Sequence, residues 1–540
     1  MKLSRKLGVH LGMATLMFVG ACTNQNPTST TASDMSGNQQ KSISILHTND
    51  MHGTYMPFLT TRDNATAQTG DAGRDTLITF DKAAKIGGFA YLASAVKKVR
   101  KEKGAENVLL VDGGDTFSDD QLGNLTKGEA MIRFMNAVNY DLMALGNHDF
   151  DYGFPRTREL EEMATFPFRA ANITDDNTQQ PIFGEPYIIT EKNGVKVAIL
   201  ALGYRNTPKT GNPDNVKGLS FKVGQDVAKT YVPELRKKAD IVVVLSHEGT
   251  AVDYKMAREV EGIDLIIGAH SHDILEPRKK IGQTFVVQAM SDGAVLGETE
   301  LIIKDQKLTD VKTHHHWLWN NQLQPDAEIQ ALIDQQRTPH LAQLQELVVE
   351  SEAVIGRQYK SESPFDKLVG NLLLKEFKGD VAIMPGVGYG ISFKPGPVTS
   401  EEVYKLLPHP SKIVTLTMTG KQLKSTLEQA AKNLKPENKL EAVGGLIQTA
   451  GIRYQIDLTK PIGERVSNVQ IKSQPVKDAQ NYKVVTHNGL LTGLHNFNEI
   501  GKGQNIIKTG KPLTDFIIQK LKEMKTVAMP DNMGEVAIKR

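Results

Sequence analysis

Five apolar segments of this chain each run directly into a cluster of Asp, Asn and His, and this pattern constrains the fold more than any other feature. The segments are SISIL (42–46), VLLV (108–111), DLMAL (141–145), IVVVL (241–245) and LIIG (265–268). Their length and apolar character are typical of buried strands, as are those of VAILAL (197–202) and FVVQA (285–289). Amphipathic stretches such as residues 89–103 lie between some of them. This alternation predicts an α/β domain whose central strands are covered on both faces.

The polar residues that follow the five strands indicate a ligand site. They are Asp50 and His52, Asp115, Asn147 and His148, His247, and finally His270 and His272. Ligands bind at strand carboxyl ends in open α/β sheets, so the clusters are expected to meet at one edge. On an extended strand end, Asp50 and His52 would point to the same side and could reach one ion. Any one cluster could be an ordinary turn or cap, but so many donors with almost no Lys or Arg would be costly to bury without cations.

The chemical types of these donors limit the metal. Carboxylate, carboxamide and imidazole groups without thiolates favour Mn, Zn, Fe, Co or Mg. The seven donors other than His148 are more than one ion with a free coordination position needs. Because a carboxylate can bridge two ions, the sequence predicts two divalent metal ions. The run from His314 to His316 is not expected to join them, because adjacent strand residues face opposite ways, and we expect a strand or surface role there.

The blocks HTNDMHG, DGGDTFSDD, LGNHDFDYG, SHEG and GAHSH, in this order and at these intervals, resemble the motifs of calcineurin-like metallophosphoesterases, specifically of the bacterial secreted 5′-nucleotidase family. The resemblance implies a four-layer αββα sandwich for about residues 42–320. The ligands it implies are Asp50, His52, Asp115 and His272 for one metal, and Asp115, Asn147, His247 and His270 for the other. It further implies that His148 is the catalytic histidine and that Asp151 orients its ring.

A chain of 540 residues is too long for one core, and its later part has a different pattern. Residues 321–352 are predicted to be a polar connector leading into one long linker helix, with Pro325 near its start. Helices are predicted at 365–377 and 421–435, and strands at 412–418, 451–457 and 482–487, which indicates a smaller α+β domain over residues 353–540. Its segments PGPVTSEEVYKLLP and IVTLTMTGKQLKSTLEQA resemble the C-terminal substrate-binding domain of 5′-nucleotidases.

The predicted substrate pocket departs from the family pattern. Where the family has an Asn-Gly-Gly-Gly-Ile-Arg loop, this chain has PGVGYG (385–390), so the Arg that binds phosphate is missing. Phe497 matches one aromatic residue that stacks on the base, whereas Leu446 and Gly503 stand where the resemblance leads us to expect a second aromatic residue and a ribose-binding Asp. One stacking ring contributes about 1 kcal/mol, so discrimination among bases is expected to be weak.

The resemblance implies a metal-dependent phosphoric ester hydrolase that cleaves 5′-nucleotides to nucleoside and phosphate by attack of a metal-bound hydroxide. Two alternatives stay open. The segments MPGVGYGISFKPG and VGGLIQTAGIRY also resemble the thiosulfohydrolases of bacterial sulfur oxidation, which would hydrolyse a sulfur ester. The protein could also bind a phosphorylated nutrient without turning it over, although the presence of both His148 and Asp151 argues against mere binding.

The first residues have the pattern of an export signal. Three basic residues precede an apolar run, residues 11–19, that is too short to span a bilayer. Cys22, the only cysteine, follows VGA and resembles the lipidated cysteine of bacterial lipoproteins; an ordinary signal peptide with a free Cys is the alternative. We therefore predict a signal peptide (1–21), a polar tether (22–41) and a lipid-anchored protein of the bacterial cell envelope, facing the periplasm or the exterior. The nearly balanced charge gives no basic surface for nucleic acid.

Overall fold

The computed structural model describes residues 40–60, 83–275, 278–388, 390–438, 440 and 443–540. The predicted signal peptide, Cys22 and nearly all of the predicted tether lie outside the described residues, so these assignments stay predictions. Within the described parts of the chain, no helix is both long enough and apolar enough to cross a membrane.

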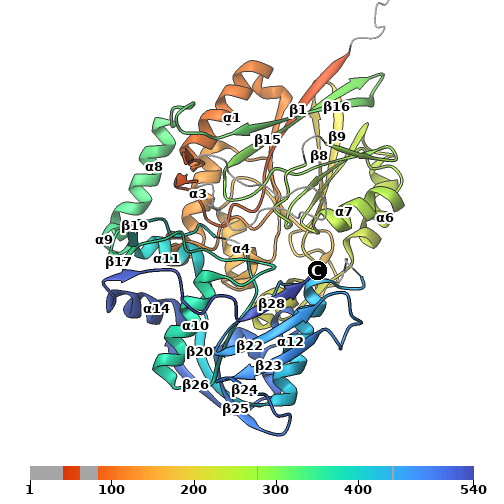
Figure 1. Cartoon of the computed structure of the whole chain (residues 1–540). Helices are drawn as coiled ribbons and strands as arrows, with labels where there is room; N and C mark the ends of the chain where they lie inside the picture. The colour runs from red at the N-terminus through yellow and green to blue at the C-terminus, as the bar shows by residue number, and fades with distance from the viewer. Residues whose placement is uncertain (1–39, 61–82, 276–277, 389, 439, 441–442) are drawn as a thin grey trace, which may run out of the picture. The chain divides into compact units, whose positions relative to one another are not determined.

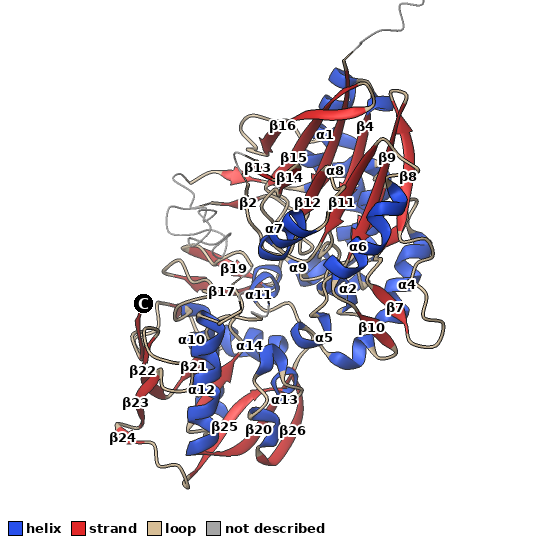
Figure 2. Cartoon of the chain, turned by 90° about the vertical axis from the view of Figure 1, so that its right-hand side faces the viewer, coloured by secondary structure: helices blue, strands red, loops and turns tan. Residues whose placement is uncertain are grey.

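Two six-stranded sheets organise the first part of the chain (Figures 1 and 2). In spatial order, the first sheet contains β16 (Lys307–Trp317), β15 (Val295–Lys304), β1 (Lys41–Thr48), β4 (Val108–Asp112), β5 (Leu142–Ala144) and β6 (Phe168–Arg169). The second contains β13 (Lys279–Ile281), β14 (Thr284–Val287), β12 (Leu265–Gly268), β11 (Ile241–Ser246), β9 (Val195–Leu202) and β8 (Tyr187–Lys192). The seven predicted strands are confirmed, and their central pairs are parallel. The histidine run, for which a strand or surface role was expected, forms the end of β16.

The two sheets face each other and are covered by helices on their outer faces. Buried side chains such as Ile45 and Val111 of the first sheet pack with Ile199 and Val243 of the second between the layers. Helices α1 (Phe89–Lys103) and α3 (Glu129–Val138) cover the first sheet, and α6 (Gly224–Leu235) and α7 (Thr250–Glu259) cover the second. The predicted four-layer αββα sandwich is therefore confirmed. We call the part from β1 to β16 the N-terminal domain.

The part from β17 onward, which we call the C-terminal domain, is a smaller α+β unit, as predicted (Figure 1). Its main sheet has the order β21 (Gln448–Ala450), β18 (Val381–Met384), β25 (Asn481–His487), β20 (Lys412–Thr419) and β26 (Gln504–Pro512). Helices α10 (Pro364–Phe377) and α14 (Leu513–Lys522) pack on one face, and α12 (Gly420–Leu434) packs on the other. A second sheet contains β24 (Gln474–Pro475), β23 (Val466–Ile471), β22 (Ile452–Asp457) and β28 (Val536–Lys539).

The single linker helix predicted within residues 321–352 is wrong. The segment forms α8 (Ala327–Arg337), the 3₁₀ turn η5 (Thr338–His340), the short helix α9 (Leu341–Leu344) and β17 (Leu347–Ser351). Pro339 cannot donate the backbone hydrogen bond that a continuous helix needs. The β-branched pair Val348 and Val349 favours a strand, and β17 pairs with β19 (Gly396–Thr399) of the C-terminal domain.

A buried ion pair joins α8, which lies between the two domains in the chain, to the C-terminal domain. Arg337, at the end of α8, donates two hydrogen bonds of 2.7 and 3.0 Å to Glu401, in α11 (Ser400–Leu406). Tyr55 of the N-terminal domain donates a hydrogen bond of 2.6 Å to the same carboxylate. All three side chains are buried, and α8 itself packs against the N-terminal core through Ile329 and Ile333. This contact holds the start of α11 against the N-terminal domain.

Candidate metal centre

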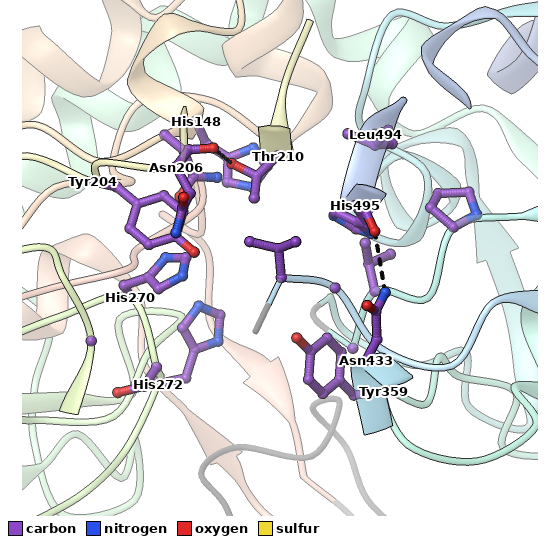
Figure 3. Close-up of a pocket in the computed structure, with 18 of the residues that line it drawn as sticks. His148, Tyr204, Asn206, Thr210, His270, His272, Tyr359, Asn433, Leu494 and His495 are labelled. Atoms are coloured by element: carbon purple, nitrogen blue, oxygen red, sulfur yellow. Dashed lines mark hydrogen bonds between the residues drawn. The ribbon is translucent and has the colours of Figure 1, made fainter. Parts of the chain in front are cut away.

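The polar clusters predicted from the sequence meet where the strands of both sheets end. A cavity of about 510 Å³ opens there between the two domains (Figure 3). The N-terminal residues that the sequence singled out and that line it are His52, Asp115, Asn147, His148, His270 and His272. Asp50 and His247 are fully buried beneath this wall. The structure therefore brings all seven predicted metal ligands to one place.

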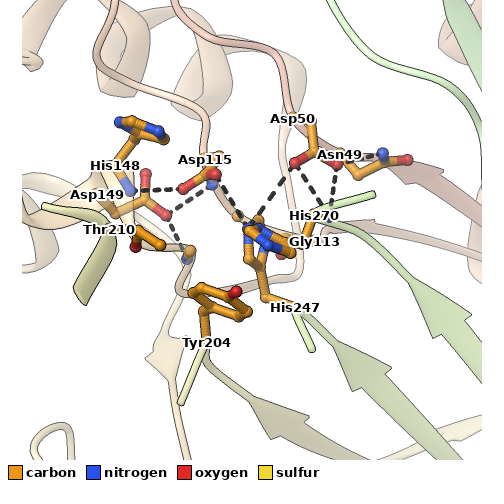
Figure 4. A network of polar contacts seen from close by, with 12 residues as sticks. Asn49, Asp50, Gly113, Asp115, His148, Asp149, Tyr204, Thr210, His247 and His270 are labelled. Carbon is orange, nitrogen blue, oxygen red and sulfur yellow. Dashed lines mark hydrogen bonds and ion pairs between the residues drawn. The ribbon is translucent and has the colours of Figure 1, made fainter. Parts of the chain in front are cut away.

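The ligand atoms form two adjoining groups. Figure 4 shows Asp115, His247 and His270 of one group together with Asp50 of the other. Asp50, His52 and His272 make one group and Asp115, His247 and His270 the other, and within each group the atoms lie within 4.8 Å of one another. In the first group, Asp50 Oδ1 lies 3.4 Å from His272 Nε2. In the second, Asp115 Oδ2 lies 3.1 Å from His247 Nε2, which is also 3.8 Å from Asp50 Oδ1. The two groups are thus close enough to act on one substrate.

The backbone at these residues is not that of a strand end. Positive φ angles occur at Asp50 (51°), His52 (46°), Asp115 (57°), His270 (72°) and His272 (53°). The expectation that Asp50 and His52 share one side of an extended strand is wrong, because β1 ends two residues before Asp50 and a left-handed turn follows. Hydrogen bonds of 2.9 Å from the Asp50 and His52 amides to the carbonyls of Gly114 and Asp115 hold this turn. Such conformations are unfavourable for non-glycine residues and cluster at functional sites.

Two buried atoms fit a metal ligand role. The side-chain oxygen of Asn147 is buried and accepts no hydrogen bond from any described residue. His247 Nδ1 lies 2.7 Å from the carbonyl of Gly113, and since a carbonyl can only accept, Nδ1 carries the proton. His247 Nε2, at the other side of the ring, makes no hydrogen bond among the described residues and faces Asp115. An imidazole oriented in this way can offer its Nε2 lone pair to a metal ion when that nitrogen gives up its proton, as in metal-binding histidines.

Opposite charges within the cluster keep its carboxylates ionised. Burial would raise the pKa of Asp50, but His272 and His247 lower it to about 2. Burial would likewise raise the pKa of Asp115, but His247 and His148 hold it well below its ordinary value. Burial alone would lower the pKa of His247, and the carboxylates of Asp115 and Asp50 instead raise it to about 10. Protons on His247 and His272, whose pKa values are both raised by neighbouring carboxylates, thus supply positive charge where a divalent metal ion would supply it.

His148 lies beside the two groups and belongs to neither. It begins the turn η3 (His148–Phe150), its amide donates a hydrogen bond of 2.7 Å to Asp115, and its Nδ1 lies 3.0 Å from Asp151 Oδ2. Burial would lower the pKa of His148, but the carboxylates of Asp119, Asp151 and Asp115 raise it well above its usual value. The pair of His148 and Asp151 has the geometry that the sequence analysis expected.

Three residues at the site were missed by the sequence analysis. Asp119 Oδ2 lies 2.7 Å from His52 Nδ1, so it orients that ring, and its φ is 82°. Asp119 falls inside the second sequence block, which was a usable signal. Tyr204 stacks on His270 with ring centroids 3.8 Å apart. His409 of the C-terminal domain stacks on His148, and no local pattern pointed to it.

The predicted substrate contact of Phe497 is wrong in this structure. Its ring is 1% exposed, packs in the C-terminal core and does not line the cavity. It follows the turn η7 (Leu494–Asn496), in which His495 has a φ of 55°, and this reversal directs His495 to the cavity and Phe497 to the core. Leu446 is buried in the same core, and a side chain at Gly503 would meet Leu416. Tyr359, Asn433, Leu494 and His495 line the C-terminal wall instead (Figure 3).

Comparison with known proteins agrees with this geometry. Residues 43–273 match the family model of the calcineurin-like phosphoesterases, and residues 340–502 match that of the 5′-nucleotidase C-terminal domain. The fold and the site thus define a metal-dependent phosphoric ester hydrolase. More particularly, the chain contains a calcineurin-like phosphoesterase domain followed by a 5′-nucleotidase C-terminal domain.

Individual relatives span nearly the whole chain. The UshA protein of Yersinia enterocolitica is 28% identical over 523 residues, which cover 87% of this chain and 88% of the relative. The structure of a 5′-nucleotidase precursor from Thermus thermophilus is 25% identical, with a TM-score of 0.81 and coverage of 93% and 100%. The sulfate thiohydrolase SoxB of Thermus thermophilus has the same TM-score at 23% identity, covering 92% of this chain and 96% of SoxB, and this likeness shows the fold alone.

Proposed function

We propose that this protein is an exported two-metal phosphoesterase that hydrolyses 5′-nucleotides to nucleoside and phosphate. The observation that carries the proposal is the pair of adjoining Asp/His groups beside the His148–Asp151 pair, at one cavity wall. One metal ion would be held by Asp50, His52, Asp115 and His272, and the other by Asp115, Asn147, His247 and His270, with Asp115 serving both. The catalytic domain would span residues 42–320 and the substrate domain residues 353–540.

Divalent ions bound by these residues, whether Mn, Zn, Mg, Fe or Co, would activate a water molecule and offset the charge of the phosphoryl group. The chain itself supplies the remaining chemistry. Asp151 holds His148 through Nδ1 and stabilises its protonated form, so that the ring can donate a proton to the leaving oxygen. Asp119 fixes the ring of His52, and Tyr204 packs on His270, which keeps both imidazoles oriented.

A nucleotide substrate is supported by the match to the 5′-nucleotidase C-terminal domain and by the name of the Thermus relative. The cavity between the domains has room for a small molecule whose phosphate reaches the metal ligands while its other end meets Tyr359 and His495. Because Phe497 is buried and the family's Arg is missing, we expect weak discrimination among bases. The likeness to SoxB shows the fold alone and therefore adds no support for hydrolysis of a sulfur ester.

The test is phosphate release from AMP by the purified protein, before and after treatment with a chelator and with each candidate metal added back. Activity that disappears with the metal and returns with one of these ions, together with about two ions per chain by elemental analysis, supports the proposal. A metal-free protein that stays fully active would refute it. A protein that releases no phosphate but hydrolyses a thiosulfonate would favour the sulfur-ester alternative.

The location of the enzyme is a separate part of the proposal. We propose that Cys22 carries the lipid that anchors the protein in the cell envelope, with the following polar residues as a tether. The variant Cys22→Ser is then expected to be released as a soluble, active protein, because stable anchoring needs more than one acyl chain and these would be lost together. Mass spectrometry of the mature N-terminus checks this, and an unmodified Cys22 retained in the mature chain would contradict it.

A further inference from the structure

His409 extends from the C-terminal domain into the catalytic wall of the N-terminal domain. It lies in the loop between α11 and β20, whereas the three residues that it contacts there belong to the N-terminal domain. Its ring stacks on that of His148, with centroids 4.9 Å apart and planes 9° from parallel. Its Nδ1 lies 3.1 Å from Asp151 Oδ2 and 3.3 Å from Asp119 Oδ1. His409 therefore contacts both members of the His148–Asp151 pair.

The loop that carries His409 is firmly held. Pro408 and Pro410 flank the histidine, and each has a restricted φ angle. The carbonyl of Pro408 accepts a hydrogen bond of 2.9 Å from Asn124 of the N-terminal domain. The carbonyl of His409 accepts one of 2.7 Å from the amide of Ser411. The backbone is thus fixed on both sides of the ring, and the contact with His148 follows from a defined loop conformation.

The contacts restrict the motions that would misalign the proton donor. Asp151 Oδ2 is shared by His148 Nδ1, at 3.0 Å, and His409 Nδ1, at 3.1 Å, so the carboxylate is held from two sides. The parallel stack leaves His148 little room to rotate about its Cβ–Cγ bond. Without His409, the side of His148 and Asp151 that faces the C-terminal domain would be open to the cavity, which His409 also lines.

We propose that His409 is a positioning residue for His148, so that the proton-donating unit is complete only where the C-terminal domain packs against the N-terminal domain. This rests on the proposed function, because it deepens the role of the same site. The consequence is that proton donation to the leaving group depends on the domain that also forms the substrate wall. An enzyme arranged in this way protonates a leaving group efficiently only when both walls of the cavity are in place.

The same four side chains, Asp119, His148, Asp151 and His409, also have ligand atoms within 4.8 Å of one another. A cation bound among them would occupy the Nδ1 atoms that face the carboxylates and would be incompatible with a proton shared between His148 and Asp151. The Nδ1 atoms of His148 and His409 both lie at hydrogen-bond distance from Asp151 Oδ2, and this arrangement favours the positioning role. The metal content of the variants separates the two possibilities.

The experiment compares three variants with the wild type. His409→Ala removes the ring, and His409→Phe keeps a flat ring for stacking but loses the nitrogen atoms. His340→Ala, in η5 and outside the site, is the control. Two substrates are used: AMP, whose alkoxide needs a proton to leave, and p-nitrophenyl phosphate, whose phenolate leaves without one. For His409→Ala we expect kcat on AMP to fall about tenfold, as part of the larger contribution of general acid catalysis, with KM changed less than about twofold. On p-nitrophenyl phosphate we expect a loss of less than about threefold, with unchanged metal content. His409→Phe should lie between His409→Ala and the wild type, and His340→Ala should match the wild type.

The double variant His148→Asn/His409→Ala is expected to be no slower than His148→Asn alone, because His409 acts only through His148. Equal losses on both esters, or additive losses in the double variant, would overturn the positioning role. Loss of a metal ion from His409→Ala would show a cation site instead and would overturn it as well. If the wild type hydrolysed neither ester, the proposed function would fail and this inference with it, whereas an active wild type with an equally active His409→Ala would refute the inference alone.

Discussion

The two walls of the cavity are built in different ways. On the N-terminal wall, the proposed metal ligands and His148 all follow within a few residues of strand ends, so the register of two sheets determines where they lie. On the C-terminal wall, the lining residues come from loops and helix ends, such as Tyr359 before α10, Asn433 near the end of α12 and His495 in η7. Regular sheet structure thus positions the residues proposed for catalysis, whereas loops and helix ends position the residues proposed to contact the rest of the substrate.

The largest effect on the N-terminal wall is expected from removing the carboxylate of Asp115. We expect Asp115→Ala to lose bound metal and to lower kcat/KM about 10³-fold or more, because metal ions contribute several kcal/mol to such reactions. Elemental analysis and phosphate release measure the two effects. Asp531→Ala, at an exposed turn, serves as the control and should behave as the wild type. If Asp115→Ala kept both metal and activity, the N-terminal wall would not be the catalytic one.

The next effect separates catalysis from metal binding on the same wall. We expect His148→Asn to reduce kcat by about 10² to 10⁴ with metal content unchanged, since general acid catalysis contributes on that scale and His148 lies outside both ligand groups. Asp151→Asn should do less damage, because the ring would remain in place. A loss of metal along with activity would show that His148 is a ligand.

The connection between the walls can be tested through the buried ion pair. Glu401→Ala leaves Arg337 buried without its partner, so we expect a loss of about 3 kcal/mol in the free energy of unfolding, measured with urea. Burial would raise the pKa of Glu401, but Lys405 and Arg337 lower it. Its contribution to stability is therefore complete above about pH 4.3, the pKa of an unfolded Glu, and is lost as the pH falls through the lower folded-state value.

A wild type that loses no more stability than Glu401→Ala between pH 6 and pH 3 would contradict this assignment of the ion pair. In that case the two walls would be held together by other contacts, such as the hydrogen bond of 2.9 Å from Gln121 to Ser400.

The sequence predicts the regular elements of this structure better than its irregular segments. The strands and the polar residues after them could be predicted because hydrophobic runs and turn residues are local signals. The left-handed turn at Asp50 could not, because it depends on hydrogen bonds to Gly114 and Asp115, more than sixty residues away. His409 reaches His148 across even more of the chain. The prediction of a single linker helix was wrong for a different reason. It followed the polar composition of the segment and gave too little weight to Pro339 and the valines after it.

Phe497 shows why a matched residue type is weaker evidence than a matched motif. The proposed metal ligands stand within blocks of several residues, and the structure brings six of them together in two groups. Phe497 was assigned from a single aromatic residue in a segment where the backbone reverses at His495, and one such reversal exchanges the residues that face the core and the cavity. Substrate recognition could therefore not be predicted in detail from the sequence.

The smallest expected effect tests this correction directly. Tyr359 lines the cavity, so Tyr359→Ala should raise KM for AMP and UMP several-fold, as loss of about 1 kcal/mol of stacking would do, and leave p-nitrophenyl phosphate nearly unaffected. Phe497→Leu should instead lower the free energy of unfolding by about 1 kcal/mol and leave both KM values unchanged, because its ring packs in the core. The wild type should use AMP and UMP with kcat/KM values within about tenfold of each other, since one ring distinguishes bases poorly. A preference above about a hundredfold would require nearly 3 kcal/mol from a contact that neither Tyr359 nor Phe497 supplies. If Phe497→Leu changed KM and Tyr359→Ala did not, Phe497 would contact the substrate after all, and the correction made here would be wrong.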